Sequence, residues 1–98
     1  MYDYVIVGAG SAGCVLAARL SEDPARRVIL LEAGGRGANP LLRVPLMTGI
    51  LLRSHYANWS YRTEAEPGLG GRSGAVPRGR VLGGSTAING MVGARGRP

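Results

Sequence analysis

The sequence contains one cysteine, one histidine and no lysine among its 98 residues. A single cysteine cannot form a disulfide within the chain, which fits a reducing compartment, so we expect the cytoplasm. The longest apolar stretch, residues 41–52, is interrupted by Arg43 and Pro45 and is too short to span a bilayer. The chain begins almost directly with a predicted strand. We therefore expect no signal peptide. No transmembrane segment and no metal site are expected either.

Charge of one sign dominates the end of the chain. All twelve basic residues are arginine, the formal net charge is +6, and no acid follows Glu66. Such a composition can indicate a surface for phosphate or nucleic acid, or it can reflect codon bias in a GC-rich genome. Few aromatic residues lie among the late arginines to stack on bases. We therefore favour codon bias and expect no nucleic-acid partner.

Glycine is abundant, with seventeen residues, of which ten follow Glu66. A chain of this length can form one small domain and no more. The first third has the composition of a globular protein. The glycine-rich last third has the composition of a segment whose backbone approaches another group closely.

Residues 1–35 have the pattern of a strand, a helix and a second strand. Tyr4–Val7 and Val28–Leu31 are short apolar runs, which are typical of buried strands. Between them a helical apolar pattern starts at Ala12 and ends at residues 21–24, since proline disfavours helix in the residue before it. This βαβ unit predicts parallel strands, a right-handed crossover and an α/β fold.

Residues 8–13 have the sequence Gly-Ala-Gly-Ser-Ala-Gly, a GxGxxG motif. Alone the motif is a weak signal, but here it lies between a predicted strand and a predicted helix. Gly8 allows the tight turn, Gly10 leaves room for a pyrophosphate, and Gly13 lets the helix pack on the strand. Amide groups at the helix N-terminus could bind the phosphates. The turn predicts a dinucleotide site without distinguishing FAD from NAD.

Glu32 ends the second predicted strand, about twenty residues beyond the motif. A carboxylate there can accept hydrogen bonds from both ribose hydroxyls and would repel the 2′-phosphate of NADP. The competing interpretation is a surface glutamate in a glycine-rich βαβ unit, and we give it little weight. Cys14, in the first helical turn, is expected to be a small buried residue rather than a reactive thiol.

Residues 36–78 are expected to form a connection of loops with a helix. Residues 41–52 could hold a helix that an internal proline and glycine weaken. Residues 58–63 favour a short strand, and residues 66–80 favour turns and loops.

Residues 79–91 form a second motif, Gly-Arg-Val-Leu-Gly-Gly-Ser-Thr-Ala-Ile-Asn-Gly-Met. The glycine pair frees backbone N–H groups, and two hydroxyls and an amide side chain follow it. Such a segment suits a flat polar ligand held by the main chain, although composition alone would favour a surface loop. Ser85 or Thr86 could cap a helix that begins here.

Together the two motifs closely resemble the signature of the glucose–methanol–choline (GMC) oxidoreductases. The resemblance covers nearly the whole chain: residues 2–14 match the family's opening, residues 30–34 its second strand, and residues 59–64 and 67–69 its next block. It implies the amino-terminal portion of a Rossmann-like FAD-binding domain of GMC type, incomplete here, similar to alcohol and choline dehydrogenases.

The resemblance also implies the FAD contacts. The first turn would hold the pyrophosphate, the end of the second strand the adenosine ribose, and residues 79–98 the flavin. The cofactor-binding residues expected in this way are Gly8, Gly10, Ser11, Ala12, Gly13, Glu32, Ala33, Val81, Gly84, Ser85, Asn89, Gly90, Met91 and Val92.

Two positions depart from patterns found in the family. Members with covalently bound flavin carry a histidine near the place of Ile88, and isoleucine has no nucleophile. The FAD is therefore expected to be noncovalent. Gly93 stands where the family usually has an aromatic residue.

In activity the resemblance implies an FAD-dependent enzyme that oxidises a small alcohol to an aldehyde or ketone, with the hydride passing to flavin N5. The family's catalytic base is a histidine near the end of a chain several times longer. The lone His55 lies far upstream of such a place, and we expect it at the surface or in packing. No catalytic residue is expected in residues 1–98, so this chain alone is expected to be inactive.

Other functions stay open from the sequence. A lyase of the same fold, similar to hydroxynitrile lyases, would hold FAD without redox chemistry, and the chain could also be a noncatalytic dinucleotide-binding fragment. A nicotinamide-binding Rossmann module does not explain residues 79–92. A basic nucleic-acid binder explains neither Glu32 nor the first motif.

Overall fold

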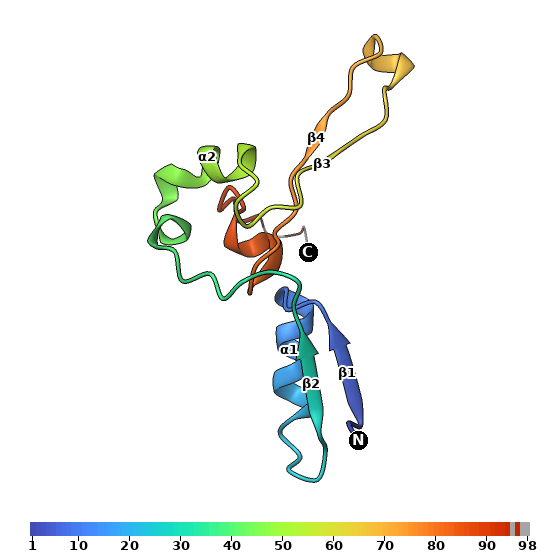
Figure 1. Cartoon of the computed structure of the whole chain (residues 1–98), viewed down its shortest axis with the longest axis vertical. Coiled ribbons are helices and arrows are strands. Elements are labelled where there is room, and N and C mark those ends of the chain that lie inside the picture. The colour runs from blue at the N-terminus through green and yellow to red at the C-terminus, as the bar shows by residue number, and fades with distance from the viewer. Residues whose placement is uncertain (95, 97–98) are drawn as a thin grey trace.

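The two predicted strands pair in parallel in the computed structural model, which describes residues 1–94 and 96. They are β1 (Tyr4–Val7) and β2 (Val28–Leu31), and they are paired along their whole length. Helix α1 (Ser11–Leu20) connects them and lies along one side of the pair (Figure 1). The βαβ unit is therefore confirmed, with the start of the helix within one residue of its predicted place.

The strands are not buried as their apolar sequences predict. Val5 is 60% exposed and Val7 is 83% exposed, and on the helix Val15 and Leu16 are exposed as well. Two strands with one helix beside them leave much of the sheet uncovered, whereas a parallel sheet normally has both faces covered. The prediction of buried strands is wrong, because no further layer covers them within residues 1–94 and 96.

The buried apolar residues instead lie where the two glycine-rich segments meet. Ala9, Leu51, Val81 and Ile88 are between 0% and 4% exposed. They come from the first glycine turn, from helix α2 (Thr48–Arg53) and from the second motif. The Cα radius of gyration is 16.8 Å, against about 13 Å for a compact domain of this size. The large radius shows that the chain is extended, and the few buried residues show that the core is small. This core joins segments that are distant in the sequence.

The helix predicted over residues 41–52 forms in pieces. Two short 3₁₀ turns, Pro40–Arg43 and Pro45–Met47, precede α2. Each turn has its proline at the first position, where the missing N–H is not needed, and a proline further along would interrupt a continuous helix. Only the second half of the prediction is confirmed as α-helix.

A hairpin projects from the body at the end opposite α1 (Figure 1). The predicted strand at residues 58–63 is β3 (Tyr61–Arg62), and it pairs antiparallel with β4 (Ala75–Val76). The expectation of turns and loops over residues 66–80 is therefore wrong at β4, because two residues give no periodic signal. Another 3₁₀ turn, Pro67–Leu69, lies in the connection between the two strands.

The second motif contains a 3₁₀ turn, Gly84–Ala87, but no side chain caps it. Gly83 takes the N-cap position with a φ of 97°, a backbone conformation that favours glycine. The Ser85 hydroxyl accepts from the N–H of Gly79 at 3.0 Å, and the Thr86 hydroxyl donates to the carbonyl of Gly83. The prediction that Ser85 or Thr86 is the N-cap is therefore wrong.

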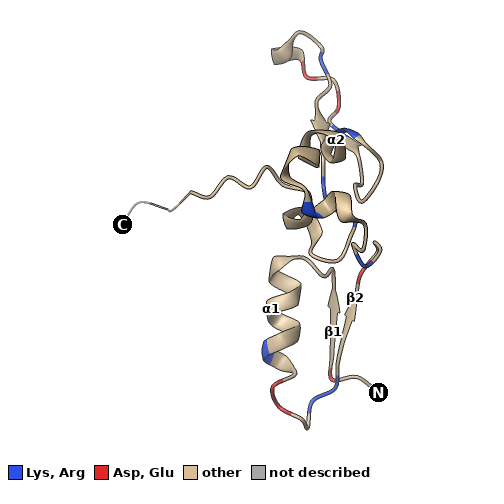
Figure 2. Ribbon diagram, turned by 90° about the vertical axis from the view of Figure 1, so that its left-hand side faces the viewer, with Lys and Arg blue, Asp and Glu red and all other residues tan. Residues whose placement is uncertain are grey.

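Beyond the second motif the chain leaves the body as an extended stretch (Figure 2). Arg95, Arg97 and Pro98, which belong to the predicted basic and flavin-contacting end, lie outside the described residues. Within residues 1–94 and 96, no helix combines the length and the apolar character needed to cross a membrane.

Asn58 is the buried polar residue that holds the middle of the chain together. It is 5% exposed. Its Nδ2 donates to the carbonyl of Leu52 at 3.1 Å, and its Oδ1 accepts from the N–H groups of Ser60 (2.9 Å) and Arg78 (3.0 Å). One side chain thus connects α2, the approach to β3 and the segment that follows β4.

We expect Asn58→Ala to destabilise the chain, because the three backbone groups lose their partner together. The expected cost is about 2 kcal/mol, which for a domain of this size lowers Tm by about 8 °C or more. Thermal unfolding followed by circular dichroism measures it. Asn39→Ala is the matched control, since Asn39 accepts one bond, from the N–H of Leu41. Equal shifts in the two variants would contradict the role given to Asn58.

Candidate cofactor-binding site

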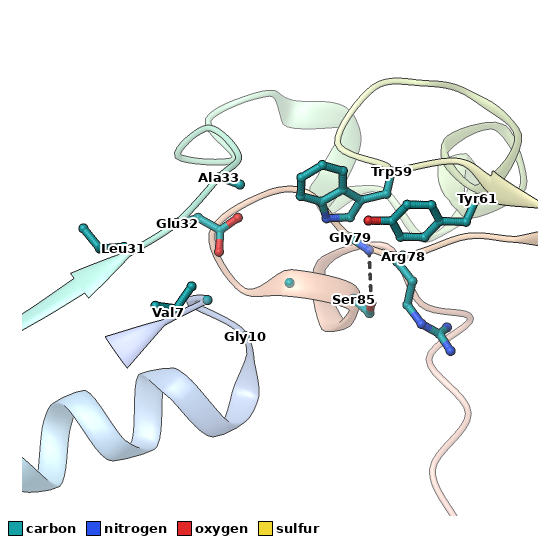
Figure 3. A pocket seen from close by; sticks show the side chains of 12 residues that line it. Val7, Gly10, Leu31, Glu32, Ala33, Trp59, Tyr61, Arg78, Gly79 and Ser85 are labelled. Carbon is teal, nitrogen blue, oxygen red and sulfur yellow. Dashed lines mark hydrogen bonds between the residues drawn. The ribbon is translucent and has the colours of Figure 1, made fainter. Parts of the chain in front are cut away.

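A cavity of about 670 Å³ opens between the first glycine turn and the second motif. Its volume is within the range of small-molecule sites, about 300–1,000 Å³. The predicted residues that line it are Gly8, Gly10, Glu32, Ala33, Gly84 and Ser85. The lining residues that were not predicted are Val7, Leu31, Trp59, Tyr61, Arg78 and Gly79 (Figure 3).

Helix α1 begins at this cavity. Gly10 is its N-cap residue and makes no side-chain cap bond, and the first turn contains no acid. The first N–H groups of a helix have no partner within it and carry partial positive charge. A neighbouring cavity of about 570 Å³ shares Val7, Gly8, Gly10 and Ser85 with the first. The predicted residues that it adds are Ser11, Ala12 and Gly13. The predicted pyrophosphate residues therefore lie together.

The absence of side chains allows two close approaches here. A Cβ on Gly13 would overlap the carbonyl oxygen of Gly8, so Gly13 brings the helix against the turn, as the motif predicts. A Cβ on Gly84 would lie 2.9 Å from the Cα of Gly10. The N–H of Gly83 also donates to the carbonyl of Ala9 at 2.8 Å. The second motif is thus packed directly on the first.

Glu32 lies at the cavity wall just after β2, and its carboxylate is partly buried. It accepts from the N–H of Ala9 at 2.8 Å and from the N–H of Gly34 at 2.9 Å. Each carboxylate oxygen can accept more than one hydrogen bond, so capacity for ribose hydroxyls remains. The position fits the predicted role, whereas the hydrogen bonds to Ala9 and Gly34 were not predicted.

An aromatic pair forms another part of the wall. The rings of Trp59 and Tyr61 are stacked, with centroids 5.9 Å apart and planes at 5°. The guanidinium of Arg80 lies 5.0 Å from the centroid of the Trp59 ring, which is a cation–π contact. Figure 3 shows the two rings side by side. Two aromatic residues two positions apart in a predicted strand were the signal that could have indicated this wall.

Several predicted flavin contacts lie elsewhere. Val81 belongs to the core, and Val92 is exposed. Asn89 and Met91 line a separate cavity of about 110 Å³, and the Asn89 side chain accepts from the N–H of Met91. Gly90 is exposed between these two. The structure does not bring this part of the predicted set to the large cavity, and its assignment to the flavin stays a prediction.

The two remaining candidate residues take no part in the large cavity. His55 is exposed, as expected. Cys14 is half-buried rather than buried, and its thiol lies 3.3 Å from the carbonyl of Ala9 as a donor. This contact fits a packing role at the first helical turn. Within the described residues, no three side chains are grouped so that they could hold a metal ion.

Comparison with known proteins gives matches over nearly the whole chain. The family model described as GMC oxidoreductase matches residues 2–98. An alcohol dehydrogenase [acceptor] of Pseudomonas putida is 57% identical over 96 residues, which cover 98% of this chain and 17% of that protein. The chain therefore spans less than a fifth of the length of this relative.

Solved structures agree with these matches. Pyridoxine 4-oxidase from Mesorbium loti superposes with a TM-score of 0.92 at 47% identity, covering 100% of this chain and 19% of that one. An FAD-dependent oxidoreductase from Chaetomium thermophilum superposes with a TM-score of 0.77 at 30% identity, covering 98% of this chain and 16% of that one.

We expect Glu32→Ala to weaken the binding of FAD, the cofactor that the sequence predicts. The variant loses the ribose acceptor and the bonds to Ala9 in the turn and to Gly34 in the loop after β2, at a cost of about 1.5–3 kcal/mol for hydrogen bonds to a charged group. This corresponds to about 10- to 150-fold in Kd, measured by titration calorimetry. Glu22→Ala is the control, because Glu22 pairs only with Arg19 at the exposed end of α1. Unchanged affinity in Glu32→Ala would refute the ribose assignment.

Proposed function

Because the chain belongs to the GMC oxidoreductase family, we propose that it binds FAD noncovalently as the amino-terminal part of an alcohol oxidoreductase. One observation carries the proposal: a cavity of about 670 Å³ has the glycine turn, the end of β2 and the second motif as its walls. The FAD-dependent oxidoreductase of similar structure supports the choice of FAD over a nicotinamide.

The residues present suit the chemistry of each part of FAD. The uncapped N-terminus of α1 and the bare backbone of Gly10 would hold the pyrophosphate. Arg78, which lines the same cavity, adds positive charge. The Glu32 carboxylate would accept from the ribose, and the stacked Trp59 and Tyr61 offer apolar surface to a flat ring.

When bound, FAD supplies a ring that accepts a hydride from an alcohol carbon. The part of this chain in that reaction is to bind and orient the cofactor. Of the side chains lining the cavity, Glu32 already accepts two backbone N–H groups, and His55 lies outside it. We propose no catalytic base here and no alcohol oxidation by the chain alone. A small alcohol is the substrate proposed for the whole protein, in the cytoplasm that the single cysteine favours.

Gly10→Val tests the proposal. A Cβ at Gly10 meets nothing within 4 Å, and Gly10 lines the cavity, so a side chain here takes up ligand space. We expect FAD binding, followed by quenching of flavin fluorescence, to weaken by at least about 100-fold because the pyrophosphate loses its place.

Gly49→Val is the matched control, since a Cβ at Gly49 also meets nothing within 4 Å and this glycine lies in α2, away from the cavity. The control should bind FAD as the unaltered chain does. Full FAD affinity in Gly10→Val, or no FAD binding by the unaltered chain, would refute the proposed function.

The bound flavin should be released by acid. Ile88 is buried and has no nucleophilic atom, so a covalent bond to the flavin cannot form at this position. We expect the yellow colour in the supernatant after precipitation with trichloroacetic acid. Absorbance near 450 nm that stays with the washed protein would instead show a covalent bond.

A further inference from the structure

A second cavity, outside the cofactor site, is lined by basic side chains. It has a volume of about 390 Å³, and Tyr61 lines both cavities. Its basic lining residues are Arg53, Arg62 and His55, and no carboxylate lines it. Nothing in the proposed binding of FAD uses these three residues.

In the part of the chain that the structure describes, the guanidinium groups of Arg53 and Arg62 have no acidic partner. Within residues 1–94 and 96, ion pairs join Arg19 with Glu22 and Arg26 with Asp23, and neither Arg53 nor Arg62 takes part. Arg62 makes one long hydrogen bond, at 3.3 Å, to the carbonyl of Ser73. Most of the N–H donors around this cavity are therefore available to a ligand.

The backbone around the cavity is held in place. Arg53 ends α2, and Arg62 lies in β3. The buried Asn58 side chain lies between these elements and bonds to Leu52 and Ser60, both of which line the cavity. The Ser60 hydroxyl donates to the carbonyl of Ser54 at 3.3 Å. These hydrogen bonds restrain the backbone from which the two arginine side chains extend.

We propose that this cavity binds a small oxyanion of the phosphate class, with Arg53 and Arg62 as its main ligands and His55 as a further donor. A guanidinium presents planar N–H groups that match two oxygens of a phosphate at once. Two such groups in a cavity without carboxylates favour an anion with two negative charges. The volume admits a phosphate with a small substituent but not a dinucleotide, which needs the larger cavity.

Titration of sodium phosphate into the full chain tests the proposal, with sodium chloride keeping the ionic strength constant. Calorimetry is run with FAD in excess, because FAD should occupy the glycine turn that could otherwise take phosphate. Without FAD, the emission of Trp59 is also followed, since Trp59 is the only tryptophan and is stacked on Tyr61 at the cavity wall.

We expect saturable binding, with Kd raised about tenfold in Arg53→Gln and in Arg62→Gln. Arg72→Gln is the matched control, because it removes the same charge from the hairpin and Arg72 does not line this cavity. Its Kd should not change. Absence of saturable binding, equal weakening in all three variants, or loss of phosphate binding when FAD is added would each overturn the proposal. Circular dichroism spectra that match across the variants show that the substitutions act on the ligand and not on the fold.

Discussion

The packing of one glycine-rich backbone segment on another is the contact on which the rest of this structure depends. The N–H of Gly83 donates to Ala9, and the N–H of Leu82 donates to Gly35 at 2.9 Å. A Cβ on Gly34 would overlap the backbone of Arg80, so this approach excludes any other residue. These contacts are made by backbone atoms, so they do not depend on a core of apolar side chains. The chain can therefore bring together residues about seventy positions apart while burying few apolar side chains.

Both the core and the large cavity follow from this packing. Ala9, Val81 and Ile88 are buried because the segments that carry them meet. The same meeting places Gly84 and Ser85 opposite the turn, where they close one side of the cavity. Glu32 then connects the turn with the loop after β2 through Ala9 and Gly34. A carboxylate that the sequence associates with a ribose therefore also stabilises the wall of the site.

The sequence predicts well what depends on local pattern. The βαβ unit follows from two apolar runs around a glycine turn, and the family follows from two motifs in order. The exposure of the strands was not predictable. An apolar run indicates a buried strand only where further layers of the fold cover the sheet. The stacked pair of Trp59 and Tyr61 was missed because the site was taken from the glycine motifs. The hydroxyls of Ser85 and Thr86 were given a capping role that a glycine with positive φ fills instead.

Hydrogen exchange at the amides of Leu82 and Gly83 tests the central claim most directly. If the second motif is packed on the first turn and on the loop after β2, the amides of Gly83 and Leu82 are both protected, because they donate to Ala9 and to Gly35. Gly34→Ala removes that protection because its Cβ would overlap the Arg80 backbone. Gly35→Ala is the matched control, since a Cβ at Gly35 meets nothing within 4 Å. The account predicts slow exchange in the unaltered chain and in Gly35→Ala, and fast exchange in Gly34→Ala. Fast exchange of both amides in the unaltered chain, or protection that survives in Gly34→Ala, would contradict it.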